Sequence, residues 1–173
     1  MKPIVSLVAA FCLVAFFASA GTPSAETLIS GAKAKASAGE KTIFVHFGAS
    51  WCGWCKRLDA FLERPDIKPV FEKYFVPVRL VVQEDEKNKE LENPGAADLF
   101  KDYGGPDGLP YSAFLNAKGA LIINSKLNGN NIGYPAQPQE IAHFIDMMKK
   151  AAPKMAELDL QTVETALKSF KKP

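Results

Sequence analysis

Short apolar runs alternate with segments of helical spacing along most of the chain. Residues 43–47 (Ile-Phe-Val-His-Phe) and residues 75–82 are mainly β-branched or aromatic, so each is expected to form a buried strand. The apolar positions that follow the first strand at spacings of three and four, and so predict a helix, are Cys55, Leu58 and Leu62. Asp66 is expected to cap a second short helix before the next strand.

The second half of the chain predicts a hairpin followed by two helices. Residues 111–115 and 120–125 flank an Asn-Ala-Lys-Gly turn, as in a β-hairpin. Residues 128–137 are rich in Asn, Gly and Pro and are expected to form a loop. Two amphipathic segments come next, with Pro153 between them. A strand–helix–strand crossover favours parallel pairing, so we expect an α/β fold with a mixed four-stranded sheet and helices on both faces.

Composition and charge exclude several classes of protein. With 47% hydrophobic and 23% charged residues, the chain is not disordered. A net charge of +2 and the lack of a basic cluster with interleaved aromatics give no support for nucleic-acid binding. The charged stretch 83–93 has mixed signs and is expected to be a solvated loop or loose helix, with a partner-binding patch as the alternative.

Residues 1–20 have the pattern of a secretory signal. Residues 4–17 are almost wholly apolar and follow a positive start, and residues 18–20 (Ala-Ser-Ala) supply the small side chains that a signal peptidase reads. We expect cleavage after Ala20 and a periplasmic or secreted protein. The apolar run of about 14 residues is short of the ~20 that span a bilayer, which argues against an uncleaved anchor. A lipoprotein cleavage site has a small residue before its cysteine, and Cys12 follows Phe11, so we do not expect a lipoprotein.

Beyond the signal, the predicted organisation has three parts. Residues 21–40 are Ala- and Lys-rich and predict an N-terminal helical segment. Residues 41–152 form the main domain, and residues 153–173 form a helical extension. The last helix, residues 158–170, is expected to pack on the domain, with partner docking as the alternative.

After cleavage the chain keeps two cysteines, Cys52 and Cys55, at the junction between a strand and a helix. A disulfide that closes so short a loop constrains the unfolded chain little, so it adds little stability to the fold. The pair is therefore a plausible catalyst. Unpaired N–H groups and the helix dipole favour a thiolate at Cys52, and Lys56 adds positive potential. Cys55 can then resolve a mixed disulfide formed at Cys52.

Other roles for the cysteine pair need residues that the chain lacks. A zinc site needs four ligands, and only His46 and His143 could join the cysteines. Covalent haem attachment needs a histidine where the chain has Lys56. We therefore expect no metal and no cofactor, while a purely structural disulfide stays open.

Two segments carry a family resemblance. Residues 47–56 (Phe-Gly-Ala-Ser-Trp-Cys-Gly-Trp-Cys-Lys) resemble the active-site segment of the thioredoxin superfamily. Residues 108–111 (Gly-Leu-Pro-Tyr) and the hairpin after them resemble its cis-proline segment. The sequence is most similar to exported bacterial thioredoxin-like proteins, over residues 41–150.

The resemblance implies a thioredoxin-like three-layer fold, to which the last helix is an addition. It also implies a cis bond before Pro110, with backbone around Leu109 that hydrogen-bonds an extended substrate. Among peptide bonds, only X-Pro bonds adopt the cis form at a small cost in free energy. The alternative is an ordinary trans proline at the start of a strand. The resemblance further implies that Trp51 shields the site or receives substrate, with a packed core aromatic as the alternative.

The chain departs from thioredoxin at two positions. Between the cysteines, Gly53 is followed by Trp54 where thioredoxin has proline, and residues there tune the reduction potential, so the redox direction is open. His46 stands where thioredoxin has a buried aspartate implicated in proton transfer. The imidazole could take that role. The favoured interpretation is a packed core histidine bonded to backbone.

Together these features predict an exported thiol–disulfide oxidoreductase that acts on protein or peptide disulfides. Reduction is the favoured direction, because the chain resembles thioredoxin more than it resembles the larger disulfide-forming oxidases, and no stretch is long enough for their inserted helical domain. An oxidase or isomerase is the alternative. Electrons would come from a membrane-embedded partner, since the usual cytoplasmic reductase is absent from that compartment. We expect a monomer. A second hypothesis is a non-catalytic module that holds a client near Trp51, Trp54 and Pro110.

Overall fold

The protein is described by a computed structural model, which covers residues 21–105 and 108–169. The predicted signal segment and Phe170 lie outside these residues. In chain order the elements are α1 (Ala25–Ala38), β1 (Thr42–Gly48), α2 (Gly53–Leu62), α3 (Lys68–Tyr74), β2 (Phe75–Val81), the 3-10 helix η1 (Glu86–Leu91), α4 (Ala96–Asp102), β3 (Tyr111–Leu115), β4 (Leu121–Asn124), β5 (Lys126–Leu127), β6 (Asn130–Asn131), α5 (Pro138–Ala151) and α6 (Glu157–Ser169).

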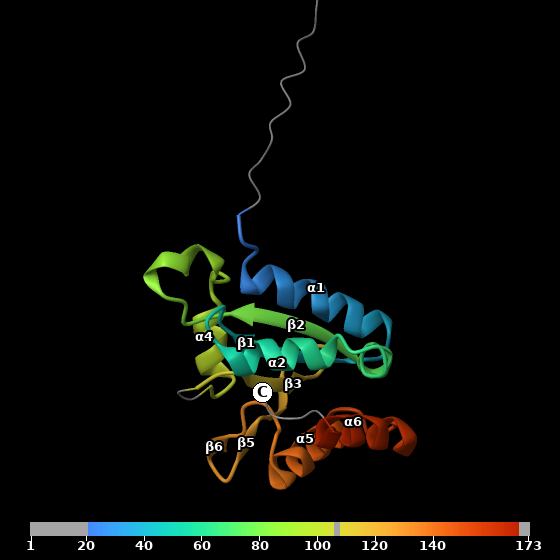
Figure 1. Ribbon diagram of the computed structural model, residues 1–173. Coiled ribbons are helices and arrows are strands. Elements are labelled where there is room, and N and C mark those ends of the chain that lie inside the picture. The colour runs from blue at the N-terminus through green and yellow to red at the C-terminus, as the bar shows by residue number, and fades with distance from the viewer. Residues whose placement is uncertain (1–20, 106–107, 170–173) are drawn as a thin grey trace, which may run out of the picture.

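Four strands form one mixed sheet in the order β2-β1-β3-β4. β1 pairs in parallel with β2 and antiparallel with β3, and β3 pairs antiparallel with β4. Helices α1 and α4 cover one face, and α2, α3, α5 and α6 cover the other (Figure 1). The predicted mixed four-stranded sheet with helices on both faces is confirmed, as is the thioredoxin-like architecture.

The central strand β1 is buried on both faces, which explains its almost continuous apolar run. Val45 and Phe47 point into the core beneath α1 and α4. Phe44 points to the other side, where its ring lies 4.9 Å from that of Phe114 and stacks on His46 at 5.7 Å. Because side chains alternate along a strand, His46 lies on the same face as α2, the helix that carries the cysteines.

The C-terminal helix α6 packs on the domain, as expected. Leu160 and Val163 are buried in the core that also contains residues of α3 and α5. The Asp159 carboxylate accepts hydrogen bonds from the Tyr74 hydroxyl at 2.6 Å and from Lys73 Nζ at 2.8 Å. These contacts fix the start of α6 against the end of α3.

Two local predictions are wrong. Asp66 does not cap α3, which begins at Lys68; both of its carboxylate oxygens accept N–H groups of Arg64 instead. Residues 128–137 are not all loop, because β5 and β6 form a small hairpin around Asn128-Gly129. Both turn residues have positive φ, 52° and 85°, which is the conformation that an Asn-Gly hairpin turn favours.

No helix in the described part of the chain combines the length and the apolar character needed to cross a membrane.

Candidate active site

Cys52 and Cys55 form a disulfide at the start of α2, just beyond the end of β1. Cys52 is the N-cap residue, and its Sγ accepts the backbone N–H of Cys55 at 3.1 Å. Cys52 is 5% exposed and Cys55 is 0% exposed. Of the two sulfurs, only that of Cys52 can therefore be contacted by a substrate, because Cys55 is fully buried.

Gly48 is a site residue that the sequence analysis did not single out. A Cβ atom at this position would stand 3.1 Å from Cys55 Cβ and 3.3 Å from Cys55 Sγ. Few side chains tolerate contacts this short, so the last residue of β1 must be small for Cys55 to pack against it. The sequence signal was a glycine that closes an apolar strand shortly before the cysteines.

The predicted cis bond between Leu109 and Pro110 is present. Leu109 packs against the buried cluster that contains both cysteines, so this segment borders the disulfide. Asn131, from β6, holds the segment in place: its side-chain amide donates to the carbonyls of Pro110 at 2.9 Å and of Gly108 at 3.2 Å. Sequence reasoning missed Asn131, although the Asn-Gly turn before it was a readable sign of the hairpin that positions it.

Trp51 is 54% exposed, so the alternative of a packed core aromatic is wrong. Its indole N–H donates to the Gln83 carbonyl at 2.7 Å. The next residue, Glu84, is buried, and its carboxylate accepts the backbone N–H and the hydroxyl of Ser50, the latter at 2.7 Å. Two neighbouring contacts thus fasten the loop before Cys52 to the segment after β2.

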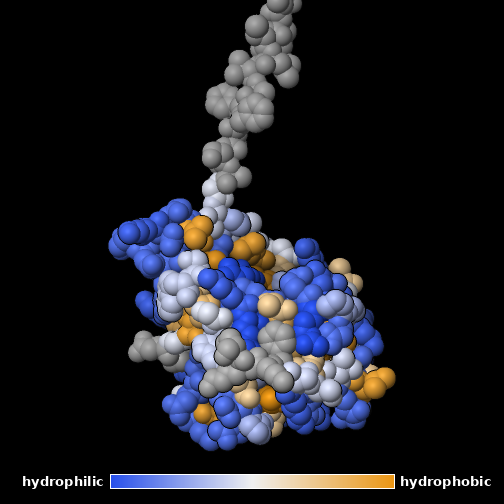
Figure 2. All heavy atoms as spheres, in the orientation of Figure 1, coloured by the Kyte–Doolittle hydropathy of each residue, from blue (hydrophilic) through white to orange (hydrophobic). Residues whose placement is uncertain are grey.

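Glu84 differs from the rest of the charged stretch that contains it. The sequence analysis treated residues 83–93 as solvated, and Figure 2 shows hydrophilic residues gathered over η1. Glu84 instead points inward, because Ser50 offers two donors for its carboxylate. In a segment of mixed charges, the sequence does not show which charged side chain has buried hydrogen-bond partners.

His46 is buried and bonds a carboxylate. Its Nε2 lies 2.8 Å from Asp59 Oδ1, and Asp59 Oδ2 accepts Arg79 Nε at 3.1 Å. The favoured interpretation of a packed core histidine is confirmed for its burial, but its hydrogen-bond partner is the Asp59 carboxylate and not the backbone. His46 Nδ1 is buried and makes no hydrogen bond to any residue that the structure describes.

Arg79 carries this polar network to the disulfide. Its Nη2 and Cys55 Sγ both lie within 4 Å of the point where a Gly48 Cβ would stand. Partial burial works to raise the pKa of Asp59, but the hydrogen bonds and charges of His46 and Arg79 outweigh burial and hold this pKa below its ordinary value. The Arg79 end of this hydrogen-bonded network and the buried sulfur of Cys55 therefore both lie next to Gly48.

The remaining predicted residues lie on the exposed side of α2 and on α5. Gly53 and Lys56 are exposed, and Trp54, 40% exposed, stacks on Tyr134 with 5.9 Å between ring centroids. His143 lies on α5 with its Nε2 3.4 Å from the Asn124 carbonyl oxygen. Across the described ranges, no three His, Cys, Asp or Glu side chains are grouped so as to hold a metal ion.

Comparison with known proteins gives the family. A family model described as thioredoxin-like matches residues 25–117, more than half of the chain. The chain belongs to the thioredoxin-like family. The match begins at α1, upstream of the resemblance seen from residue 41, in agreement with the packing of α1 on the sheet. Family membership and the intact Cys52–Cys55 pair identify the chain as a thiol–disulfide oxidoreductase.

Comparison with solved structures finds matches at low identity. A disulphide isomerase from Xylella fastidiosa Temecula1 is 24% identical, with a TM-score of 0.52 over 83% of this chain and 88% of that chain. The C-terminal domain of DsbD from Neisseria meningitidis, in its oxidised form, is 21% identical, with a TM-score of 0.43 over 61% of this chain and 84% of that one. No curated protein matches the chain.

Proposed function

We propose that the chain is an exported oxidoreductase that reduces disulfides in proteins or peptides. The observation that carries the proposal is the asymmetry of the cysteine pair, in which Cys52 keeps a small exposed fraction of 5% and Cys55 is fully buried behind it. An attacking thiol must be accessible to the client disulfide, whereas a resolving thiol needs only to reach the sulfur of the attacking cysteine. The segment around Leu109 and Pro110 borders the same pair and supplies backbone for an extended substrate.

The proposed reaction starts from the reduced pair. The Cys52 thiolate attacks one sulfur of the client disulfide; a bond from Cys52 Sγ to that sulfur forms, and the second client sulfur leaves as a thiolate that takes a proton from water. The Cys55 thiolate then attacks Cys52 Sγ and displaces the first client sulfur. The client has gained two electrons, and the Cys52–Cys55 disulfide has been formed.

The position of Cys52 favours the first step. The Cys55 backbone N–H already points at Cys52 Sγ in the oxidised state, and α2 is a ten-residue helix whose positive end lies there. Both features stabilise negative charge on this sulfur. We infer that the His46–Asp59–Arg79 network tunes the second step, since its Arg79 end and the buried sulfur of Cys55 both lie next to Gly48.

Direction and location rest on other features of the chain. Reduction is proposed because the described elements between β1 and β3 are short and leave no room for an inserted helical domain. The signal pattern of residues 1–20 supports export. In the periplasm or outside the cell, a membrane-embedded dithiol donor would return the two electrons to the Cys52–Cys55 disulfide. The chain would act as a monomer.

A disulfide-reduction assay tests the proposal. With dithiothreitol as electron donor and a disulfide-bonded model protein as client, the wild type should accelerate reduction and Cys52→Ser should not. Cys55→Ser, once reduced and then freed of dithiothreitol, should form a stable mixed disulfide with the client through Cys52, visible by mass spectrometry. Equal, negligible rates for wild type and Cys52→Ser would support instead a module that only holds a client.

A further inference from the structure

Asn131 joins the segment before β3 to the β5–β6 hairpin. Its side-chain Nδ2 donates to the carbonyl oxygens of Pro110 at 2.9 Å and Gly108 at 3.2 Å. Its Oδ1 accepts the Ser125 hydroxyl at 2.8 Å and the Gly133 N–H at 3.1 Å. One amide thus uses both of its N–H donors and both lone pairs of its oxygen, and four contacts fix its position.

The partners of Asn131 leave its amide one orientation. The Gly133 N–H can only donate and the two carbonyls before β3 can only accept, so Oδ1 must face the hairpin and Nδ2 must face the carbonyls. Ser125 is 0% exposed, and its Oγ accepts the Ser112 backbone N–H at 3.0 Å while its hydrogen goes to Asn131. The amide is therefore held from β3 through one buried hydroxyl group.

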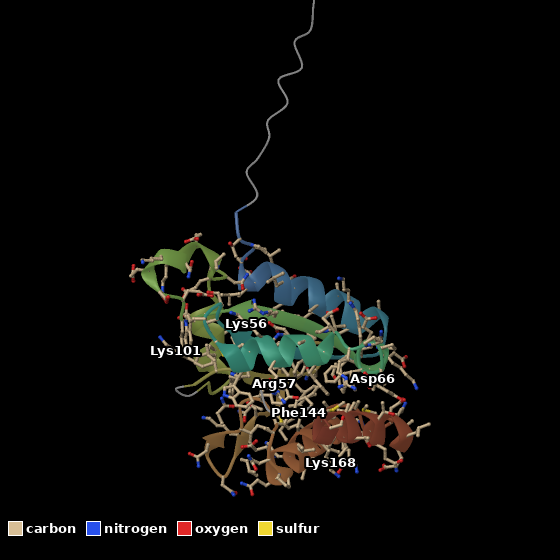
Figure 3. All side chains as sticks on the ribbon, viewed as in Figure 1. Lys56, Arg57, Asp66, Lys101, Phe144 and Lys168 are labelled. Atoms are coloured by element: carbon tan, nitrogen blue, oxygen red, sulfur yellow. A yellow bond between two sulfur atoms is a disulfide. The ribbon has the colours of Figure 1, made fainter. Side chains whose placement is uncertain are left out.

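The stretch after β6 is also fixed to the helix that carries the cysteines. The Tyr134 ring stacks on Trp54 with 5.9 Å between centroids, and the Arg57 guanidinium carbon lies 5.0 Å from the Tyr134 centroid. Figure 3 shows Arg57 on the side of α2 that faces α5 and the β5–β6 hairpin. Asn131 therefore lies in a frame that is anchored to both β3 and α2.

Leu109 has backbone groups that no described residue uses. The carbonyls on either side of it, those of Gly108 and Pro110, face Asn131. Its own N–H and C=O make no hydrogen bond to any residue that the structure describes. Leu109 is partly exposed, and its side chain packs against the cluster that contains both cysteines. A client chain beside the disulfide would therefore meet one free donor and one free acceptor, as at the edge of a β-sheet.

We propose that Asn131 is a positioning residue for client binding. By holding the Gly108 and Pro110 carbonyls, it directs the Leu109 N–H and C=O toward an extended client before that client arrives. Without the amide, the segment would have to be ordered as the client binds, which weakens binding. The role concerns the main chain of the client, so it applies to polypeptide disulfides and not to small disulfides that have no peptide groups. The proposal rests on the proposed function and adds how the client is recognised.

The rate at which two kinds of disulfide oxidise the reduced protein tests the proposal. Protein that has been reduced and freed of dithiothreitol is mixed with a disulfide-bonded peptide or with bis(2-hydroxyethyl) disulfide, which has no peptide group. Asn131→Ala should lower the second-order rate constant for the peptide by about fivefold, the equivalent of one neutral hydrogen bond, and leave that for the small disulfide unchanged. Asn131→Asp keeps the size and the acceptor but lacks both N–H donors, so it should lower the rate constant for the peptide at least as far.

Asn130→Ala is the matched control, because it removes the same side chain from the neighbouring position of β6. Asn130 is exposed, and its amide makes one long hydrogen bond, 3.4 Å to the Asn128 carbonyl oxygen. This variant should keep both wild-type rate constants. An equal fall in both rate constants for the two Asn131 variants, or an unchanged rate constant for the peptide, would overturn the proposal. Failure of the wild type to react with the peptide would instead overturn the proposed function.

Discussion

At the scale of single residues, identical side chains differ because of their surroundings. The two cysteines differ in exposure because Cys52 is the N-cap of α2, at the edge of the domain, whereas Cys55 turns inward against Gly48. Gly48 has no side chain, so the strand end and the helix can approach until the Cys55 sulfur touches the backbone. The redox pair therefore depends on one residue that takes no part in the chemistry.

Gly48→Ala should destabilise the protein. The new methyl group would lie 3.1 Å from Cys55 Cβ, so either β1 or α2 must shift, and overpacking of this kind costs about 1–3 kcal/mol. Urea unfolding of the oxidised protein measures the change. Gly53→Ala is a matched control, because a Cβ there meets nothing within 4 Å, and it should leave the free energy of unfolding unchanged or raise it by up to about 1 kcal/mol. Equal effects of the two substitutions would contradict the close-approach role of Gly48.

At the scale of elements, a hydrogen-bonded group of polar side chains joins two strands and a helix near the active site. His46 comes from β1, Asp59 from α2 and Arg79 from β2, and the Asp59 carboxylate bridges the other two. His46 and Arg79 face each other in the parallel register of β1 and β2, which brings their side chains to the same helix. The network fixes α2, and with it the cysteines, relative to the sheet.

The network predicts a specific acid sensitivity. The pKa of Asp59 is lower in the folded protein than its ordinary value of about 3.9, so the stability that it contributes is present above that pH and is lost as pH falls through the lowered pKa. The free energy of unfolding should fall below about pH 4 in the wild type, and less steeply in Asp59→Asn. Asp98→Asn, which removes an exposed carboxylate from α4, should keep the wild-type slope. Identical slopes for wild type and Asp59→Asn would contradict the assignment.

At the scale of the whole molecule, the architecture followed from local patterns. The apolar run of β1, the helical spacing after Cys52 and the Asn-Ala-Lys-Gly turn were enough to predict the element order and the mixed sheet. The cysteine pair and Pro110 were readable because their spacing and type carry the chemistry. The partners of Glu84, Asn131 and Asp59 were not readable, because each contact joins segments that only the tertiary fold brings together.

In the proposed function, the Cys52–Cys55 pair acts as a reductant of client disulfides. The most direct test is the equilibrium reduction potential of the pair, measured against glutathione with the chain from residue 21 onward. We predict a value near that of thioredoxin, about −270 mV. A value near about −120 mV would contradict the claim, because a pair with that potential oxidises client thiols.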